Sequence, residues 1–326
     1  MLVAAATVLR AAGPAGPAAP VKLSPAEAAA VIRAIEKDRA ETEAWLKSDP
    51  TSYLATIDRK DFLNKTTLTL GRAADNDVRI DSSDVQPHHL KVTVEGDRFR
   101  VDAVDPGAQF RATIRAAGVT GGGAAGNVAS QPQEQALRTA TLDPGNIRVG
   151  RYLVRLSHQR FPAIIVFDPQ SPHFKEYKGL QYFKPDLAYR FVLPLTPNPK
   201  NETIIVMSTR GNQRRAQRVG WFDLLIDGKP VRFEAVRLLE PGVGEQELSI
   251  FFRDATSGQE TYGLGRYVDA TPVKGTPGQY RLDFNLAYNP ACAFSDHYNC
   301  PIPSKANTVS ASIRAGEMDS RYHSAP

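Results

Sequence analysis

The sequence predicts a mainly β protein with one helix near its N-terminus. Short runs of alternating apolar and polar residues, divided by Asp, Asn, Gly and Pro, recur from residue 51 to residue 317. One stretch, residues 24–50, instead has apolar residues at helical spacing. The chain has 326 residues, of which 42% are hydrophobic and 23% charged. This composition is typical of a globular protein, and the length allows two domains.

Residues 1–23 are expected to be a leader. Leu2–Leu9 is apolar and small residues follow it, as at the end of a secretory signal, but no positive charge precedes it. We interpret the segment either as a clipped signal peptide or as a disordered Ala/Pro/Gly leader. The sequence does not choose between an exported (periplasmic or extracellular) and a cytoplasmic location.

Residues 24–50 are predicted to form an amphipathic helix. Ser24 is a good N-cap, Pro25 suits the first turn, and Asp49–Pro50 ends the pattern. A long amphipathic helix at the edge of a domain usually contributes packing, so no chemistry is assigned to it.

Residues 51–160 are predicted to form a β-sandwich built from hairpins. A low-complexity insertion at residues 120–135 interrupts it and is expected to be a flexible surface loop. Its glycines lack the Lys-Ser/Thr partner and the strand–helix setting of a phosphate-binding loop.

Within this segment, Gly71–Arg72, Asn76–Val78 and His89 resemble the core of a forkhead-associated domain, the β-sandwich that binds phosphothreonine. The resemblance implies a forkhead-like sandwich. Gln86–Pro87 stands where that family has the Ser and Arg that hold the phosphopeptide, and Arg72 alone supplies too few converging donors. Phosphopeptide binding is therefore not predicted.

Several classes of partner are not predicted either. The sequence contains no run of about 18 apolar residues, which is the length needed to span a membrane, so no membrane span is predicted. The net charge of +5 is spread along the chain, which does not favour nucleic acid. His88 and His89 face opposite sides of a strand, and the spacing of Cys292, His297 and Cys300 matches no familiar zinc pattern. No motif indicates a nucleotide, haem or flavin, so neither a metal nor a cofactor is predicted.

Residues 161–317 are predicted to form a second antiparallel β-domain, a barrel or a sandwich, followed by a tail at 318–326. Asp227–Gly228 is a strong hairpin signal between two of its strands. Closing the sheet into a barrel would remove exposed edges.

Three strings in this domain, SPHFKEYKGLQYF, FFRDATSGQETYGLGRYVD and DFNLAYNPACAF with YNCPIP, resemble the DUF1684 family of prokaryotic proteins. The similarity extends over roughly Ile35–Glu317 and so includes the helix and the forkhead-like segment. The family is named for its unknown function. The resemblance therefore implies a bacterial protein, a fold and a pocket, but it supplies no reaction.

The stretch Phe251–Cys300 is rich in polar side chains. Arg253 and Arg266 lie on the two arms of a predicted hairpin, with Arg190 as a third arginine, and converging guanidiniums repel unless an anion lies between them. This predicts a pocket that binds a small carboxylate or phosphate. The residues expected to bind it are Arg190, Arg253, Asp254, Ser257, Tyr262, Arg266, Tyr267, Asp283, Asn285 and Asn289. The alternative is a structural network in which Asp254, Glu260, Asp269 and Asp283 pair with the arginines.

Two other functions stay open, as does the question whether the protein is an enzyme. A hydrolase or transferase could use Ser257, Cys292 with His297 as its base, or an Asp–Tyr pair in the same pocket. A protein-interaction module would need no small ligand. Cys292 and Cys300 are expected to form a disulfide or to remain two buried thiols.

Overall fold

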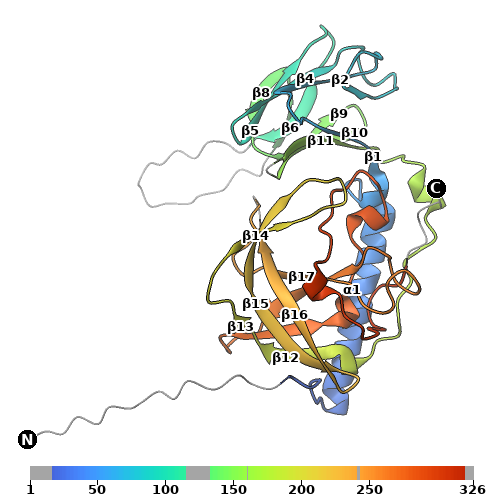
Figure 1. The fold of residues 1–326 in the computed structure, drawn as a ribbon. Coiled ribbons are helices and arrows are strands. Elements are labelled where there is room, and N and C mark those ends of the chain that lie inside the picture. Colours follow the sequence, from blue (N-terminus) through green and yellow to red (C-terminus); the bar gives the residue numbers. More distant parts are fainter. Residues whose placement is uncertain (1–16, 115–132, 160, 241–242, 320–326) are drawn as a thin grey trace, which may run out of the picture. The chain divides into compact units, whose positions relative to one another are not determined.

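The computed structural model describes residues 17–114, 133–159, 161–240 and 243–319 (Figure 1). It is mainly β, with mostly antiparallel sheets and one long N-terminal helix, which confirms the predicted fold class. Residues 1–16 of the predicted leader, 120–132 of the predicted insertion and 320–326 of the predicted tail lie outside the described residues.

The chain divides into two compact units. The sandwich unit includes Ala40–Gly179 and Phe294–Asn299. The C-terminal unit is drawn from Met1–Arg39, Leu180–Ala293 and Cys300–Arg321. Helix α1 (Pro25–Ser48) contributes residues to both.

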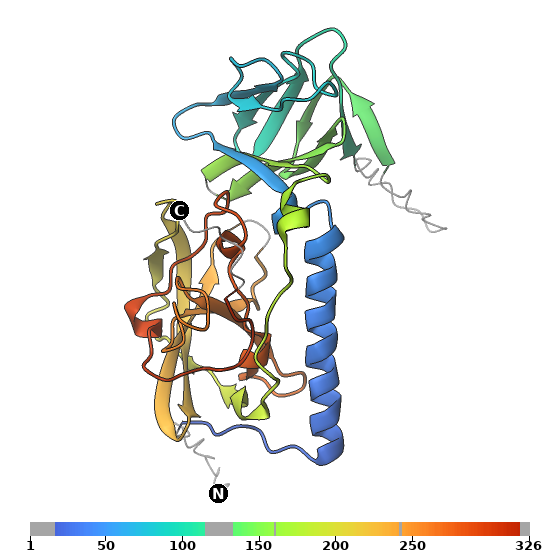
Figure 2. The ribbon, with the colours of Figure 1, turned by 90° about the vertical axis from the view of Figure 1, so that its right-hand side faces the viewer.

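Helix α1 begins with a capping box. The Ser24 backbone N–H donates to Glu27 Oε2 (2.8 Å), and the Glu27 N–H donates to Ser24 Oγ (3.4 Å). These bonds satisfy two of the backbone donors that a helix leaves open at its start. Figure 2 shows α1 as one continuous rod. Among the described residues, no helix combines the length and the apolar composition needed to cross a membrane.

The sandwich unit contains two sheets with strand orders β1-β11-β10-β9-β6-β7 and β3-β2-β4-β5-β8. Strand β11, which the predicted boundary at residue 160 assigns to the second domain, pairs with β1 and β10 here. Residues 133–135, predicted as part of the insertion, begin β7. The strands are β1 (Thr56–Asp61), β2 (Thr67–Gly71), β3 (Val78–Arg79), β4 (Leu90–Glu95), β5 (Arg98–Ala103), β6 (Phe110–Ile114), β7 (Gln133–Leu137), β8 (Thr139–Leu142), β9 (Gly145–Val149), β10 (Tyr152–Gln159) and β11 (Phe161–Phe167).

Alternation along these strands builds the core of the sandwich. In β5, for example, Phe99 and Val101 are buried while Arg98 and Arg100 are exposed. Both sheets supply such inward residues, among them Val92 from β4 and Val154 from β10. A sandwich core of this kind is held by burial of apolar surface.

The C-terminal unit is organised around one sheet with the order β12-β19-β18-β17-β16-β15-β13, and β14 also pairs with β15. Its long hairpin β15–β16 turns at Asp227 and Gly228, whose φ angles of 50° and 72° suit a tight two-residue turn. The strands are β12 (Arg190–Pro194), β13 (Thr196–Pro197), β14 (Thr203–Val206), β15 (Arg214–Ile226), β16 (Lys229–Leu238), β17 (Leu248–Phe252), β18 (Arg266–Pro272) and β19 (Gln279–Asp283).

The inner face of this sheet carries a core of phenylalanines. Phe233 and Phe252 lie 5.8 Å apart by ring centroids, and Phe284 packs edge-on against Phe252 at 5.4 Å. The N-terminal segment then joins the two ends of the sheet: the Ala18 N–H donates to Asp223 O of β15, and the Val21 N–H donates to Arg190 O of β12. Edge strands that would otherwise expose open backbone groups are thereby partly paired.

The C-terminal segment that follows β19 packs on the sheet, as Figure 2 shows. Tyr288 forms a backbone bridge with Tyr267, and Thr308 forms one with Arg253. Short helices punctuate the loops of the chain: η1 (Tyr53–Ala55), α2 (His173–Glu176), η2 (Leu187–Tyr189), η3 (Phe284–Leu286), η4 (Ala291–Ala293) and η5 (Lys305–Asn307).

Candidate functional site

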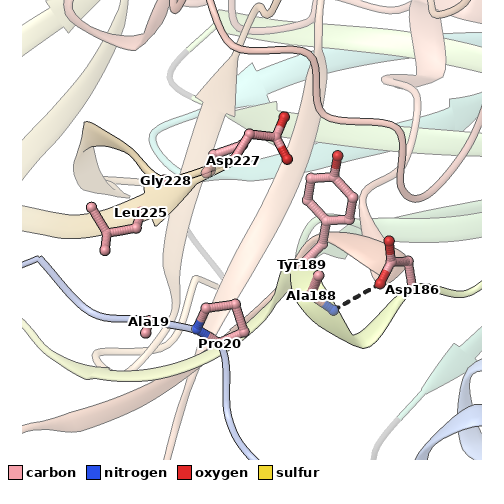
Figure 3. Close-up of a pocket in the computed structure, with 9 residues that line it drawn as sticks. Ala19, Pro20, Asp186, Ala188, Tyr189, Leu225, Asp227 and Gly228 are labelled. Atoms are coloured by element: carbon pink, nitrogen blue, oxygen red, sulfur yellow. Dashed lines mark hydrogen bonds between the residues drawn. The ribbon is translucent and has the colours of Figure 1, made fainter.

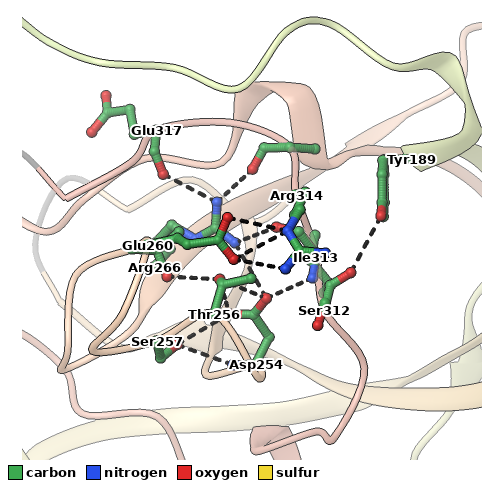
Figure 4. Close-up of polar contacts among 12 residues, drawn as sticks. Tyr189, Asp254, Thr256, Ser257, Glu260, Arg266, Ser312, Ile313, Arg314 and Glu317 are labelled. Carbon is green, nitrogen blue, oxygen red and sulfur yellow. Dashed lines mark hydrogen bonds and ion pairs between the residues drawn. The ribbon is translucent and has the colours of Figure 1, made fainter.

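Arg266, the first residue of β18, lies inside the C-terminal unit. Its side chain has no solvent-exposed surface, and its guanidinium lies over the Phe252 ring. Nη1 donates to the Ala315 and Glu317 carbonyls, and Nη2 donates to the Ile313 carbonyl (2.8 Å) (Figure 4). Burial lowers the pKa of Arg266, while the nearby carboxylate of Asp254 opposes that shift. The guanidinium is therefore used to hold the C-terminal segment.

Asp254 completes this arrangement and organises a turn. Its carboxylate accepts hydrogen bonds from Thr256 Oγ1 (2.9 Å), Ser257 Oγ (3.1 Å) and the Ile313 N–H (2.6 Å). Ser257 Oγ in turn accepts a bond from the Asp254 N–H (3.1 Å). Reciprocal bonds of this kind stabilise turns. In the structure Ser257 thus serves the turn between β17 and β18.

Arg190 and Asp283 are cross-strand partners on β12 and β19 and form an ion pair. Asp283 also accepts hydrogen bonds from the backbone N–H (3.1 Å) and the side-chain amide (2.9 Å) of Asn285. Asn285 then binds both backbone groups of Asp186 at 2.8 Å. This chain of contacts fixes the loop that leads into β12. Asp254 pairs with Arg266 and Asp283 pairs with Arg190, as in the structural-network alternative. Glu260 pairs with a different arginine, Arg314.

Asn289 holds a buried glutamate. Its backbone N–H donates to Glu317 Oε2 (2.8 Å), and its side-chain amide donates to Met318 O (2.8 Å). Burial raises the pKa of Glu317 to about 7, although the Asn289 bond and the charge of Arg266 act in the opposite direction. Sequence reasoning did not select Glu317, because only the folded chain reveals its burial.

The tyrosines and cysteines form a second cluster. The Tyr267 hydroxyl donates to Pro301 O (2.5 Å), and burial raises the pKa of Tyr267. The Tyr262 hydroxyl donates to Cys292 O (3.2 Å). Cys292 and Cys300 are buried thiols, and the Cys292 N–H donates to Cys300 Sγ (3.2 Å).

The structure does not bring Arg253 and Arg266 together. Phe252 pairs in register with Arg266 and shares its inner face, so the next residue, Arg253, points to the opposite face and is exposed. Arg190 lies on β12 and is separated from β18 by β19. The expected convergence of three guanidiniums is therefore wrong, since the alternation of an extended strand sends the two hairpin arginines to different faces.

One pocket of the C-terminal unit is acidic. It has a volume of about 320 Å³ and lies between the N-terminal segment, η2 and the β15–β16 turn. In Figure 3, Asp186, Tyr189 and Asp227 border the same space. The Tyr189 hydroxyl donates to Ser312 O (3.2 Å). Burial, and to a lesser extent the negative charge of Asp227, raises the pKa of Tyr189. With two carboxylates at its rim, this pocket does not suit an anion.

A second pocket, which we call the outer pocket, has a volume of about 310 Å³ and lies on the sheet face opposite the phenylalanine core. Its walls are mostly apolar, and its polar groups come from Arg218, Glu234, Ser304 and Asn307. The lining residues are Ile204, Ile205, Val206, Met207, Arg218, Glu234, Val236, Phe251, Ile302, Pro303, Ser304 and Asn307.

Charged and amide groups order the floor of the outer pocket. Arg218 forms ion pairs through Nε with Glu234 and through Nη1 with Glu202. The Asn307 side chain binds both backbone groups of Glu234, at 2.7 and 3.0 Å. The available sequence signals, the apolar run Ile204–Met207 and the nearby arginines, resemble an ordinary strand. Sequence reasoning therefore missed this pocket.

The forkhead-like residues have structural partners in the sandwich unit. His89 is buried; its Nδ1 accepts from the Gln86 N–H (3.0 Å), and its Nε2 lies 2.8 Å from Gln109 O. His88 has other partners: its Nε2 lies 3.2 Å from Asp75 Oδ1, and its backbone N–H donates to Asp105 Oδ2 (2.9 Å). No group of three His, Cys, Asp or Glu side chains within the described ranges is arranged to hold a metal ion.

Comparisons with known proteins give a family but no activity. The solution NMR structure of the uncharacterized protein from gene locus rrnAC0354 of Haloarcula marismortui is similar, with 32% sequence identity over 48% of this chain and 85% of that chain, at a TM-score of 0.39. No curated protein matches the chain. Residues 175–318 match the family described as "Protein of unknown function (DUF1684)". This match supports placing that part of the chain in the DUF1684 family.

Proposed function

We propose that the C-terminal unit is a binding module for a small apolar monocarboxylate, held in the outer pocket. The observation that carries the proposal is the combination of apolar walls with an oriented, partly used guanidinium. Small-molecule sites are usually concave, mostly apolar and equipped with a few fixed polar groups. The outer pocket has this composition, with Phe251 and Val236 beside Arg218.

Arg218 offers hydrogen-bond donors to a ligand. A guanidinium has five N–H donors, and the two ion pairs use those on Nε and Nη1. Nη2 makes no hydrogen bond with any of the described residues. Because Glu202 and Glu234 fix the orientation of the group, a ligand would not have to order it on binding.

The charge at the rim favours an anion. Arg253 and Phe251 are two residues apart on an extended segment and share a face, and the Arg253 N–H donates to the carbonyl of the pocket residue Asn307 (2.9 Å). Lys305 lies between the pocket residues Ser304 and Asn307. Arg253 and Lys305 are exposed and form no ion pair with the described residues. Arg218 pairs with two glutamates, Glu202 and Glu234, which leaves one excess negative charge. The positive charges of Arg253 and Lys305 offset it.

The size of the pocket bounds the ligand. At about 30 Å³ for each water-sized group, a volume of about 310 Å³ holds on the order of ten non-hydrogen atoms. An eight-carbon carboxylate such as octanoate has this size. A dissociation constant between about 10 µM and 1 mM is reasonable for such a ligand.

The test is a thermal-shift and calorimetric comparison of octanoate with 1-octanol. Binding to the native state raises the melting temperature by mass action. Octanoate is expected to bind more tightly than the alcohol, and the doubly substituted Arg253→Gln/Lys305→Gln variant is expected to lose about tenfold affinity for octanoate only. Lys274→Gln, an exposed lysine that does not line the pocket, is the matched control. Equal binding of acid and alcohol would refute the anionic part of the proposal.

We further propose that the sandwich unit is a degenerate forkhead-associated domain and that the DUF1684 similarity extends beyond residues 175–318 to about Ile35. Two packed β-sheets and a buried His89 that holds the Gln86 loop support the first statement. Titration with a phosphothreonine peptide is expected to give no binding, because Gln86–Pro87 replaces the gripping Ser and Arg.

A further inference from the structure

The two cysteines of the chain are neighbours in space as well as in sequence. Both side chains are buried, with 5% exposure for Cys292 and 6% for Cys300. The Cys292 backbone nitrogen lies 3.2 Å from Cys300 Sγ. Because an N–Cα bond is about 1.46 Å long, Cys300 Sγ lies within about 4.7 Å of Cys292 Cα. This separation is compatible with a disulfide, in which the partner sulfur is bonded at about 2.05 Å to Cys292 Sγ and therefore lies within about 5 Å of Cys292 Cα.

Surrounding groups distinguish the two sulfurs. The Tyr262 hydroxyl lies 3.9 Å from Cys292 Sγ. A hydrogen bond from the Cys300 thiol lowers the pKa of the Cys292 thiol, and the same bond, together with burial, raises the pKa of Cys300. The positive charge of Arg214 lowers the pKa of Cys300 and so partly opposes this rise. Since the thiolate is the reactive form of cysteine, Cys292 is the nucleophilic member.

We propose that Cys292 and Cys300 form a reversible dithiol–disulfide site in which Cys292 attacks the oxidant and Cys300 resolves the product. The oxidant is a small hydroperoxide. Cys292 sulfur attacks one peroxide oxygen, the O–O bond breaks, and the leaving oxygen takes the thiol proton, giving a sulfenic acid and water or an alcohol.

Cys300 sulfur then attacks Cys292 sulfur and completes the oxidation. The S–O bond breaks, the hydroxyl leaves as water with the Cys300 proton, and an S–S bond forms. The two thiols together lose two electrons and the peroxide gains two. An added dithiol reverses the change by exchange through a mixed disulfide. Burial of both sulfurs restricts the first step to small oxidants.

The test uses the full chain and intact-mass measurement without reductant. After hydrogen peroxide, the wild type is expected to become about 2 Da lighter, and dithiothreitol is expected to restore the original mass. In Cys300→Ser, dimedone is expected to label Cys292, because the sulfenic acid cannot be resolved. In Cys292→Ser, Cys300 is expected to label at least about fivefold less. Circular dichroism checks that both variants fold.

Each of the following outcomes would overturn the proposal. Equal dimedone labelling of the two single variants would show that the assignment of Cys292 as the attacking cysteine and Cys300 as the resolving cysteine is wrong. Progress of the wild type to sulfinic or sulfonic acid, or no reaction with peroxide, would show that the pair does not act as a redox site. If the serine variants fail to fold, peptide mapping of wild type after brief iodoacetamide treatment decides the direction: faster modification of Cys292 supports it, and equal or faster modification of Cys300 contradicts it.

Discussion

Arg266 Nη2 and Asp254 Oδ2 lie 3.6 Å apart, and neither side chain has any exposed surface. Asp254 follows β17 and Arg266 begins β18, so the pair spans the base of the turn between these strands. Through the carbonyls of Ile313, Ala315 and Glu317, the same guanidinium also holds a segment about fifty residues further along the chain. Part of the polar cluster therefore builds the domain and is closed to a ligand.

Replacing Arg266 by methionine is expected to lower the free energy of unfolding by about 3–5 kcal/mol, because it leaves Asp254 as an unpaired buried charge. The measurement is urea unfolding followed by circular dichroism and tryptophan fluorescence. Arg232→Met is the matched control, since Arg232 pairs with Asp223 while 61% of its side chain is exposed. Its expected cost is below about 1 kcal/mol. Similar costs for both variants would contradict the structural role of Arg266.

Glu317 predicts that stability falls as the pH rises from about 4.5 to 7. The pKa of this buried carboxyl is about 7 in the folded chain, against an ordinary value of 4.5. Within that window the folded state keeps a proton that the unfolded chain releases, so raising the pH favours unfolding. Below the window both states are protonated and the contribution is complete; above it the contribution is lost. The size of the loss is on the order of 3 kcal/mol.

Glu317→Gln isolates this titration from those of other groups. Glutamine keeps an oxygen that can accept from the Asn289 N–H but does not titrate near neutral pH. Unfolding free energies of wild type and variant, measured by urea at several pH values, are expected to converge near pH 4.5 and to separate as the pH rises, with the variant less pH-sensitive. Parallel pH profiles would show that Glu317 is not protonated in the folded state at neutral pH.

Gly316 is expected to be irreplaceable because of space as well as backbone conformation. Its φ is 79°, and a Cβ there would lie 2.5 Å from Ala287 O and 2.7 Å from Phe284 O. Gly278 has nearly the same φ, 78°, but nothing lies within 4 Å of an added Cβ. Gly278→Ala is expected to cost about 1 kcal/mol and Gly316→Ala about 3 kcal/mol. Thermal unfolding of both variants measures the two costs, and the cost of Gly316→Ala is expected to be at least twice that of Gly278→Ala.

The sequence predicted local features of the fold better than the site. The capping box at Ser24, the Asp227–Gly228 turn and the mainly β architecture depend on neighbouring residues or on alternation, so they are visible in one dimension. Arg266 donates to backbone carbonyls of a segment without strand periodicity. Backbone acceptors leave no side-chain pattern in the sequence, so these contacts could not be predicted from it. The separation of Arg253 from Arg266 depends on the register Phe252–Arg266, and a shift by one residue would have reversed it.

The outer pocket could not be predicted for a related reason. Its polar residues, Arg218, Glu234 and Asn307, come from β15, β16 and η5 and meet only after the long hairpin and the C-terminal segment have packed together. Each of these residues alone resembles an ordinary polar position on a strand or loop.

Titration calorimetry of octanoate with the wild type and a pocket-filling variant tests most directly whether the outer pocket binds a small apolar carboxylate. Val206 lines the pocket and is 9% exposed, whereas Val192 on β12 is 40% exposed and does not line it. We expect Val206→Phe to lose at least about tenfold affinity, because the larger ring occupies ligand volume, and Val192→Phe to bind as the wild type does. Binding that is unchanged in Val206→Phe, or absent from the wild type, would contradict the claim.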